Sequence, residues 1–126
     1  MTDQDTLPVD TLIMDEYFSN SYEYAQAIFE VVLSTVIPET IDFIKAGNNM
    51  SHEDLRRAVH KVKPSFKMTG FPVIFDEMNK TEELCLGDAS QVLIDNKLKH
   101  LETLVNESKL ILKKQLNYIE SQLKQA

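Results

Sequence analysis

His60 lies at the centre of a short basic stretch of an otherwise acidic chain. Residues 52–70 carry five Lys and Arg against two Asp and Glu, whereas residues 1–51 carry one Lys against nine Asp and Glu. Neutral imidazole is a nucleophile that can carry a phosphoryl group as a covalent intermediate. Nearby cations disfavour the protonated ring and offset the charge on a transferring phosphoryl group. These residue types therefore predict a histidine that takes part in phosphoryl transfer.

The position of His60 on its helix predicts that the ring faces outward. At roughly 100° per residue, the apolar residues of this segment fall within about 60° of Leu55, and His60 falls roughly 140° away from it. A hydrogen-bonded core histidine is therefore disfavoured. A surface histidine without a function, on a solvated basic face, stays open as the alternative. The apolar residues that define the stripe are Leu55, Ala58, Val59, Val62 and Phe66.

Lys63 follows His60 by one helical turn and is the cation best placed to contact a phosphoryl group. Lys67 and Arg56 are second candidates on the same side of the helix. Pro64 cannot donate a hydrogen bond to the His60 carbonyl, which costs on the order of 3 kcal/mol in an exposed helix interior. We expect Pro64 to bend the helix and to open the backbone beside the imidazole.

The run VHKVKPSFKMTG, residues 59–70, resembles the histidine phosphotransfer (HPt) domain of multistep two-component phosphorelays. That family has an aliphatic residue two positions after the histidine, a lysine three after it, glycine and then serine or alanine, and a glycine ten after it. The helices before and after the run also fit the family's bundle. Pro64 replaces the usual glycine, and Phe66 replaces a usual small residue. The positions that agree are His60, Val62, Lys63, Ser65 and Gly70.

The resemblance implies that His60 accepts a phosphoryl group from an aspartyl phosphate on a receiver domain and passes it to another receiver. The partners would be response-regulator receiver domains, a hybrid histidine kinase, or both. The chain would be a phosphocarrier without autokinase activity or a nucleotide site, and any Mg²⁺ would be supplied by the partner, so no cofactor is expected. Lys63 would stabilise the phosphate, supported by Arg56, Pro64, Ser65, Lys67 and Gly70.

Two other functions stay open. The chain could dock receivers or act as a scaffold without being phosphorylated, or it could be a structural bundle whose exposed faces oligomerise. The two further histidines, His52 and His100, are interpreted as surface residues, and the single cysteine, Cys85, as core filling. No Glu-x-x-His pair that would predict a metal-binding bundle precedes any histidine.

The elements that position His60 read as helices almost throughout. A helical period runs from Ala25 to Ile44 with a break or kink at Pro38, and the next helix begins after Ser51 and ends at Gly70. Further helices precede Gly87 and run from a cap at Asp88 or Ser90 to about residue 123, and a short helix lies near residues 11–18. The last helix would be roughly 50 Å long, more than a small bundle needs, so we expect its end to overhang or fray. The sequence predicts an all-α fold, an up-and-down antiparallel four-helix bundle with a short N-terminal capping helix.

Composition places this bundle among compact domains. The 126 residues, 43% of them hydrophobic, predict a single domain over residues 1–126 whose first nine residues form a poorly ordered tail. The net charge of −7 opposes binding to nucleic acid or anionic lipid, and no apolar run is long enough to span a membrane. An acidic N-terminus without an apolar core predicts no signal peptide, and a single cysteine fits a reducing compartment. We therefore expect a cytoplasmic monomer.

Overall fold

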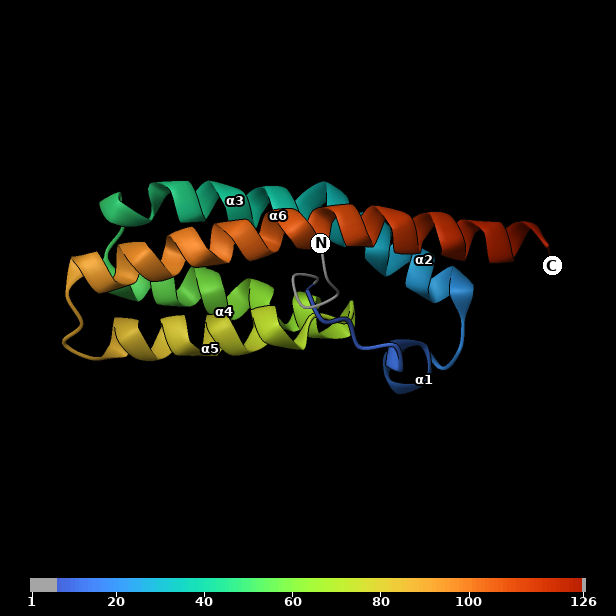
Figure 1. Cartoon of the computed structure of the whole chain (residues 1–126), viewed down its shortest axis with the longest axis horizontal. Coiled ribbons are helices and arrows are strands. Elements are labelled where there is room, and N and C mark those ends of the chain that lie inside the picture. Colours follow the sequence, from blue (N-terminus) through green and yellow to red (C-terminus); the bar gives the residue numbers. More distant parts are fainter. Residues whose placement is uncertain (1–6, 126) are drawn as a thin grey trace.

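The computed structural model describes residues 7–125, and within them it contains helices but no β-strand (Figure 1). An all-α fold is therefore confirmed for the described part of the chain. The helices are α1 (Ile13–Phe18), α2 (Tyr22–Val31), α3 (Ile37–Ala46), α4 (His52–Met68), α5 (Pro72–Leu86) and α6 (Gln91–Lys124).

The helices pack lengthwise around α6, the longest of them (Figure 1). α6 contacts α2, α3 and α5, while α4 packs most extensively against α5 and also contacts α3. α4 and α5 are about half as long as α6 and lie beside its first half, and the last turns of α6 extend beyond the start of α2. The expected overhang of the last helix is thus present.

Local hydrogen bonds define where α4 and α6 begin. The Ser51 hydroxyl accepts a hydrogen bond from the Asp54 backbone N–H at 3.1 Å, and the Ser90 hydroxyl accepts one from the Leu93 N–H at 3.3 Å. Each side chain satisfies a backbone donor that the first helical turn leaves free. Ser90, and not Asp88, is therefore the residue that caps α6.

The sequence predicts a break at Pro38, but the irregular segment of the helix lies before this residue. Residues Val32–Val36 form a π-helical segment that joins α2 to α3, and Pro38 occupies the first turn of α3. Proline has no N–H for the carbonyl four residues before it, so the regular ladder cannot continue through this point. The wider π turn before Pro38 accommodates that loss, and the chain continues as helix on both sides.

Residues 7–9, which the sequence predicts as part of a poorly ordered tail, are packed against the helices. The Leu7 side chain is buried, and Val9 packs against the core. The Asp10 N–H donates a 2.8 Å hydrogen bond to the Gly70 carbonyl, which fixes this segment at the end of α4. The rest of the predicted tail, residues 1–6, lies outside the described residues.

The core is formed by the apolar stripes that the helical period predicts. In α4 the buried residues are Leu55, Val59, Val62 and Phe66, while Ala58 is half-buried. Cys85 is buried, as expected for a core-filling residue. Among residues 7–125, no helix has the length and apolar character needed to cross a membrane.

Candidate functional site

His60 lies near the middle of α4, and its side chain is 66% exposed. Of its two neighbours in α4, Val59 is buried and Lys61 is exposed. The ring therefore lies at the edge of the helix face that packs on the core. The outward orientation that the helical wheel predicts is therefore observed. A neutral ring in this position is accessible to another protein.

The closest polar partner of His60 is a carboxylate from the neighbouring helix. His60 Nδ1 lies 2.9 Å from Glu82 Oε1, and Glu82 lies on α5, which packs against α4. The Glu82 side chain is only 14% exposed. The sequence analysis expected cations around the ring, so this carboxylate contact is a correction to that picture.

Lys63 joins the same group through Glu82. Its ammonium nitrogen lies 2.8 Å from Glu82 Oε2 and 2.7 Å from the amide oxygen of Asn79, and its side chain is 14% exposed. The two oxygens of one carboxylate thus contact the imidazole and the ammonium group separately. Lys63 therefore lies in the same cluster as His60, and its charge is shared with Glu82.

The contacts of Glu82 determine which nitrogen of His60 is free. An ionised carboxylate only accepts hydrogen bonds, and the two Glu82 oxygens contact one nitrogen each, Nδ1 of His60 and Nζ of Lys63. Nδ1 of His60 therefore carries the proton, and this N–H donates a hydrogen bond to Glu82 Oε1. In a neutral ring the lone pair is then on Nε2, the nitrogen that this contact leaves free.

The other predicted cations are divided among separate partners. Arg56 pairs with Glu53 at 2.7 Å, and Lys67 lies over the Phe75 ring, 4.8 Å from its centroid. The Arg56 pairing raises the pKa of this guanidinium above its ordinary value and, mainly through the hydrogen bond, lowers the pKa of Glu53. Neither Arg56 nor Lys67 contacts the His60 ring.

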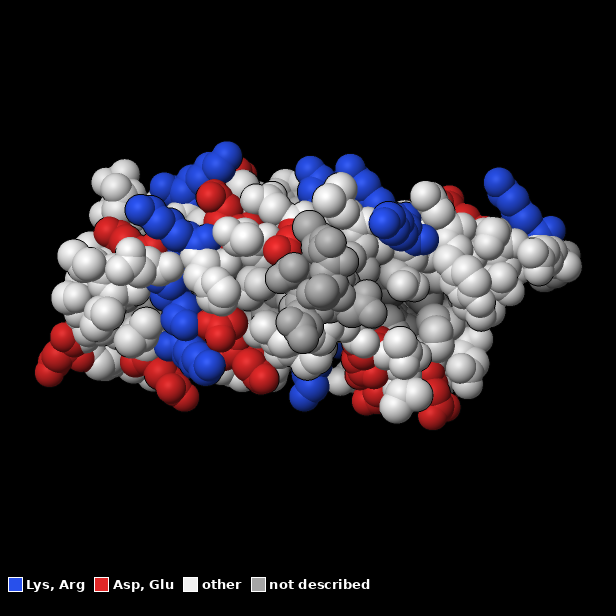
Figure 2. All heavy atoms as spheres, viewed as in Figure 1, with Lys and Arg blue, Asp and Glu red and all other residues white. Residues whose placement is uncertain are grey.

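Opposite charges are interleaved over α4 and α5 (Figure 2). Arg57 also pairs with Glu53, and Lys61 reaches Glu39 of α3 at 2.9 Å. The basic stretch seen in the sequence is therefore folded among carboxylates from its own helix, from α3 and from α5. It does not form one continuous basic patch.

The remaining predicted residues shape the helix around His60. Pro64 is exposed, and α4 is continuous through it, so the expected opening of the backbone is not seen as a break in the helix. Phe66 is fully buried, so its ring fills the core. The Ser65 carbonyl accepts a hydrogen bond from the Thr69 hydroxyl, and Gly70 has φ +100° where the chain leaves α4.

Glu82 and Asn79 are the site residues that the sequence reasoning missed. They are polar, half-buried and three positions apart, next to the buried α5 residues Met78, Thr81 and Cys85. Such polar positions beside an apolar stripe often face the neighbouring helix. Only the packing of α4 on α5 identifies their partners, because neither residue lies near His60 in the sequence.

The chain was compared with known proteins in three ways. No protein-family model, no curated protein and no solved structure matches it.

Proposed function

We propose that this chain is a histidine phosphotransfer domain that accepts a phosphoryl group on His60 from a receiver-domain aspartyl phosphate and passes it to another receiver. The observation that carries this proposal is the contact of His60 Nδ1 with Glu82, because it leaves Nε2 as the exposed nucleophile. The resemblance of residues 59–70 to the family motif supports the same assignment.

The arrangement accounts for the chemistry of transfer. Nε2 attacks the phosphorus of the aspartyl phosphate, the new N–P bond forms, and the P–O bond to the aspartyl carboxylate breaks. Nδ1 keeps its proton, so the ring becomes positively charged and the carboxylate leaves as an anion. Glu82 then lies beside the positive ring and stabilises it, as the carboxylate of a Ser-His-Asp triad does. Transfer to a second receiver reverses these steps.

Lys63 supplies the cation of the proposed site. Its side chain is tethered at Glu82, next to the imidazole, and a lysine side chain has enough rotatable bonds to move toward a phosphoryl oxygen on Nε2. A single ammonium group offsets part of the phosphoryl charge. Any Mg²⁺ belongs to the receiver in this scheme.

The proposal includes the finer form of the fold. The segment from α2 to α3 together with α4, α5 and α6 makes an up-and-down four-helix bundle, with α1 as a short capping helix. The short connections between successive helices and the packing of α6 against α2, α3 and α5 support this arrangement. In this bundle the middle of α4 is open to a docking partner. We further propose that the chain acts as a cytoplasmic monomer, with receiver domains or a hybrid histidine kinase as partners.

The test is to incubate the chain with a panel of receiver domains that carry a labelled aspartyl phosphate. We expect an acid-labile, alkali-stable label on His60, located by mass spectrometry, and no label on His60→Gln. The matched control is His100→Gln, because His100 is also an exposed histidine. Circular dichroism checks that both variants keep the helical content of the parent. Undiminished labelling of His60→Gln would contradict the proposal.

A second candidate function is docking of receivers without phosphorylation. It is favoured by the contacts of Lys63, whose ammonium group is already bound by both Asn79 and Glu82. The same panel separates the two functions. Receivers that bind the chain in a pull-down but never label His60 would select the docking function.

A further inference from the structure

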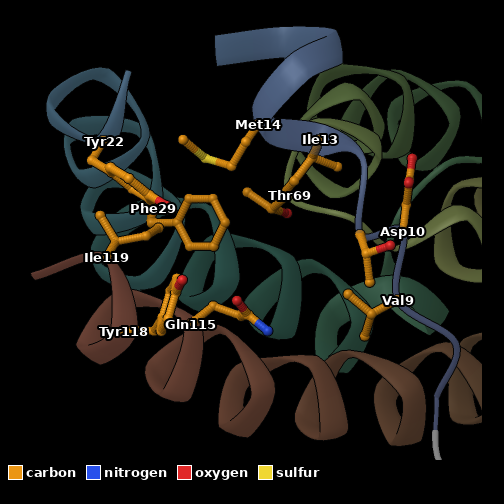
Figure 3. Close-up of a pocket in the computed structure, with 11 residues that line it drawn as sticks. Val9, Asp10, Ile13, Met14, Tyr22, Phe29, Thr69, Gln115, Tyr118 and Ile119 are labelled. Carbon is orange, nitrogen blue, oxygen red and sulfur yellow. The ribbon is translucent and has the colours of Figure 1, made fainter. Parts of the chain in front are cut away.

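The structure contains a cavity beside the C-terminal end of α4, away from His60 (Figure 3). Its volume is about 250 Å³, and it lies among α1, α2, α6 and the segment that precedes α1. Of the residues that line the cavity, Thr69 is the closest to His60 in the sequence, and it directly follows α4. Thr69 is nine positions after His60 in the chain, which is about 13 Å along a helix.

The cavity follows from the unequal lengths of the helices. α4 ends at Met68 and α5 begins at Pro72, whereas α6 continues to Lys124. The second half of α6 therefore packs against α2 but has no continuation of α4 or α5 beside it. The segment before α1 and α1 itself cover this part of α6, and they are too short to fill the whole space.

The walls are mainly apolar and aromatic. Phe29 of α2 and Ile119 of α6 are buried side chains that line the cavity, and Met14 of α1 closes it from the other side (Figure 3). Tyr22 and Tyr118 form an edge-to-face pair at 6.4 Å and also line it. Tyr118 is 53% exposed, so part of this aromatic wall is reached from solvent.

The few polar groups of the wall further restrict the kind of ligand that the cavity can bind. Gln115 and Thr69 line the space (Figure 3). The Thr69 hydroxyl donates to the Ser65 carbonyl, so its oxygen and the amide oxygen of Gln115 can each accept a hydrogen bond from a ligand. Among the described residues that line the cavity, only Asp10 is charged, and its carboxylate accepts a hydrogen bond from the Leu12 N–H at 2.9 Å. Its negative charge opposes an anionic ligand.

From the volume, the aromatic walls and the negative charge of Asp10, we propose that this cavity binds a small uncharged aromatic molecule of one or two rings that carries a hydrogen-bond donor. A cavity of about 150 Å³ lined by apolar side chains is large enough to bind benzene, so this one has room for a second ring. The aromatic rings of the wall favour a planar ligand. This site is independent of the proposed phosphotransfer function.

The experiment uses indole as the probe and the ¹³C-labelled methyl groups of methionine as reporters. We expect indole to shift the Met14 methyl resonance with a dissociation constant on the order of 1 mM and to leave that of Met78, which is buried in α5 away from the cavity wall, unchanged. Indole-3-carboxylate, which adds a negative charge, is expected to bind about tenfold more weakly. A change at Met78 without a change at Met14 would overturn the proposal, as would no shift of Met14 up to the solubility limit of indole.

A pair of variants locates the ligand. Gln115→Trp places a large side chain at the cavity, and Lys114→Trp places the same side chain at the adjacent exposed position, which is not part of the wall. Both positions are exposed, so neither substitution removes a core side chain. We expect Gln115→Trp to weaken indole binding at least about tenfold and Lys114→Trp to bind as the parent does. Equal affinities of the two variants would overturn the assignment.

Discussion

Glu82 Oε1 lies 2.9 Å from His60 Nδ1, and the other oxygen of this carboxylate lies 2.8 Å from Lys63 Nζ. One side chain of α5 therefore positions both α4 residues that the sequence assigns to phosphoryl transfer. The link has two consequences. It orients the imidazole with Nε2 outward, and it places a negative charge where the ring would become positive in the proposed transfer.

The first prediction separates these two consequences of Glu82. In Glu82→Gln the amide oxygen still accepts a hydrogen bond from Nδ1, but the charge is lost. We expect phosphoryl transfer to slow by about tenfold, which corresponds to about 1.4 kcal/mol. In Glu82→Ala the orientation is lost as well, and we expect a decrease of about a hundredfold.

The measurements are single-turnover transfer rates and ¹⁵N NMR of the His60 ring. The spectrum should show the Nδ1-protonated tautomer in the parent and in Glu82→Gln, and a mixture of tautomers in Glu82→Ala. Equal transfer rates in all three proteins would show that Glu82 has only a structural role.

The second prediction concerns the buried ion pair of Lys63. In Lys63→Met the Glu82 carboxylate loses one of its two partners while it stays largely buried. We expect a loss of about 2 kcal/mol in the free energy of unfolding, because a buried charged group is left with an unmade hydrogen bond. Urea unfolding measures it.

Lys67→Met is the matched control for Lys63→Met. Lys67 is an exposed lysine of the same helix that lies over Phe75, a contact that contributes about 0.5 kcal/mol at exposed sites. Equal losses in the two variants would mean that the contact of Lys63 with Glu82 adds nothing to stability.

The third prediction concerns Gly70, whose φ of +100° is rarely adopted by residues with a side chain. A Cβ added there would lie 3.0 Å from the Asp10 carbonyl oxygen and 3.3 Å from Val9 Cγ1. We expect Gly70→Ala to lower the free energy of unfolding by about 2 kcal/mol. The loss reflects both the strained backbone and the displaced segment before α1.

Gly87→Ala is the control for this backbone effect. Gly87 has φ −97°, and the nearest atom to an added Cβ is 3.7 Å away. Its free energy of unfolding should stay within about 0.5 kcal/mol of the parent. Urea unfolding of both variants decides the matter, and a Gly70→Ala chain as stable as Gly87→Ala would refute the prediction.

The fourth prediction concerns the free energy of unfolding at acidic pH. The hydrogen bond from Lys97 is the main reason that the pKa of Glu77 lies below its ordinary value of 4.5, and Lys80 lowers it further. The folded chain therefore holds this proton less tightly than the unfolded chain does. The stability that the ionised form provides is present above about pH 4.5 and is lost as the pH falls through the lower, folded pKa.

Urea unfolding between pH 6 and pH 3 tests this dependence with Glu77→Gln. The parent should be the more stable protein at pH 6, and its advantage over the variant should shrink as the pH falls. Glu83→Gln, at an exposed position of the same helix, is the control and should show little pH-dependent difference from the parent. An advantage that stays constant down to pH 3 would contradict the prediction.

The sequence by itself determined the helices and the outward face of His60. Local effects govern both: the apolar period of α4 sets its buried side, Ser51 fixes its start, and Gly70 supplies the positive φ that ends it. Pro38 likewise signalled an irregular helix, although the π turn that accommodates it lies at Val32–Val36. Effects of this kind depend on neighbours within a few residues of the chain.

Tertiary structure alone decided what surrounds the imidazole. Glu82 and Asn79 reach His60 and Lys63 only because α5 packs on α4, and the pairing of Lys61 with Glu39 depends on α3. The sequence therefore predicted free cations where the fold places ion pairs. The cavity beside Phe29 also exists only in the fold, because it arises from the different lengths of helices far apart in the sequence. Contacts between distant segments depend on packing geometry, which local periodicity does not encode.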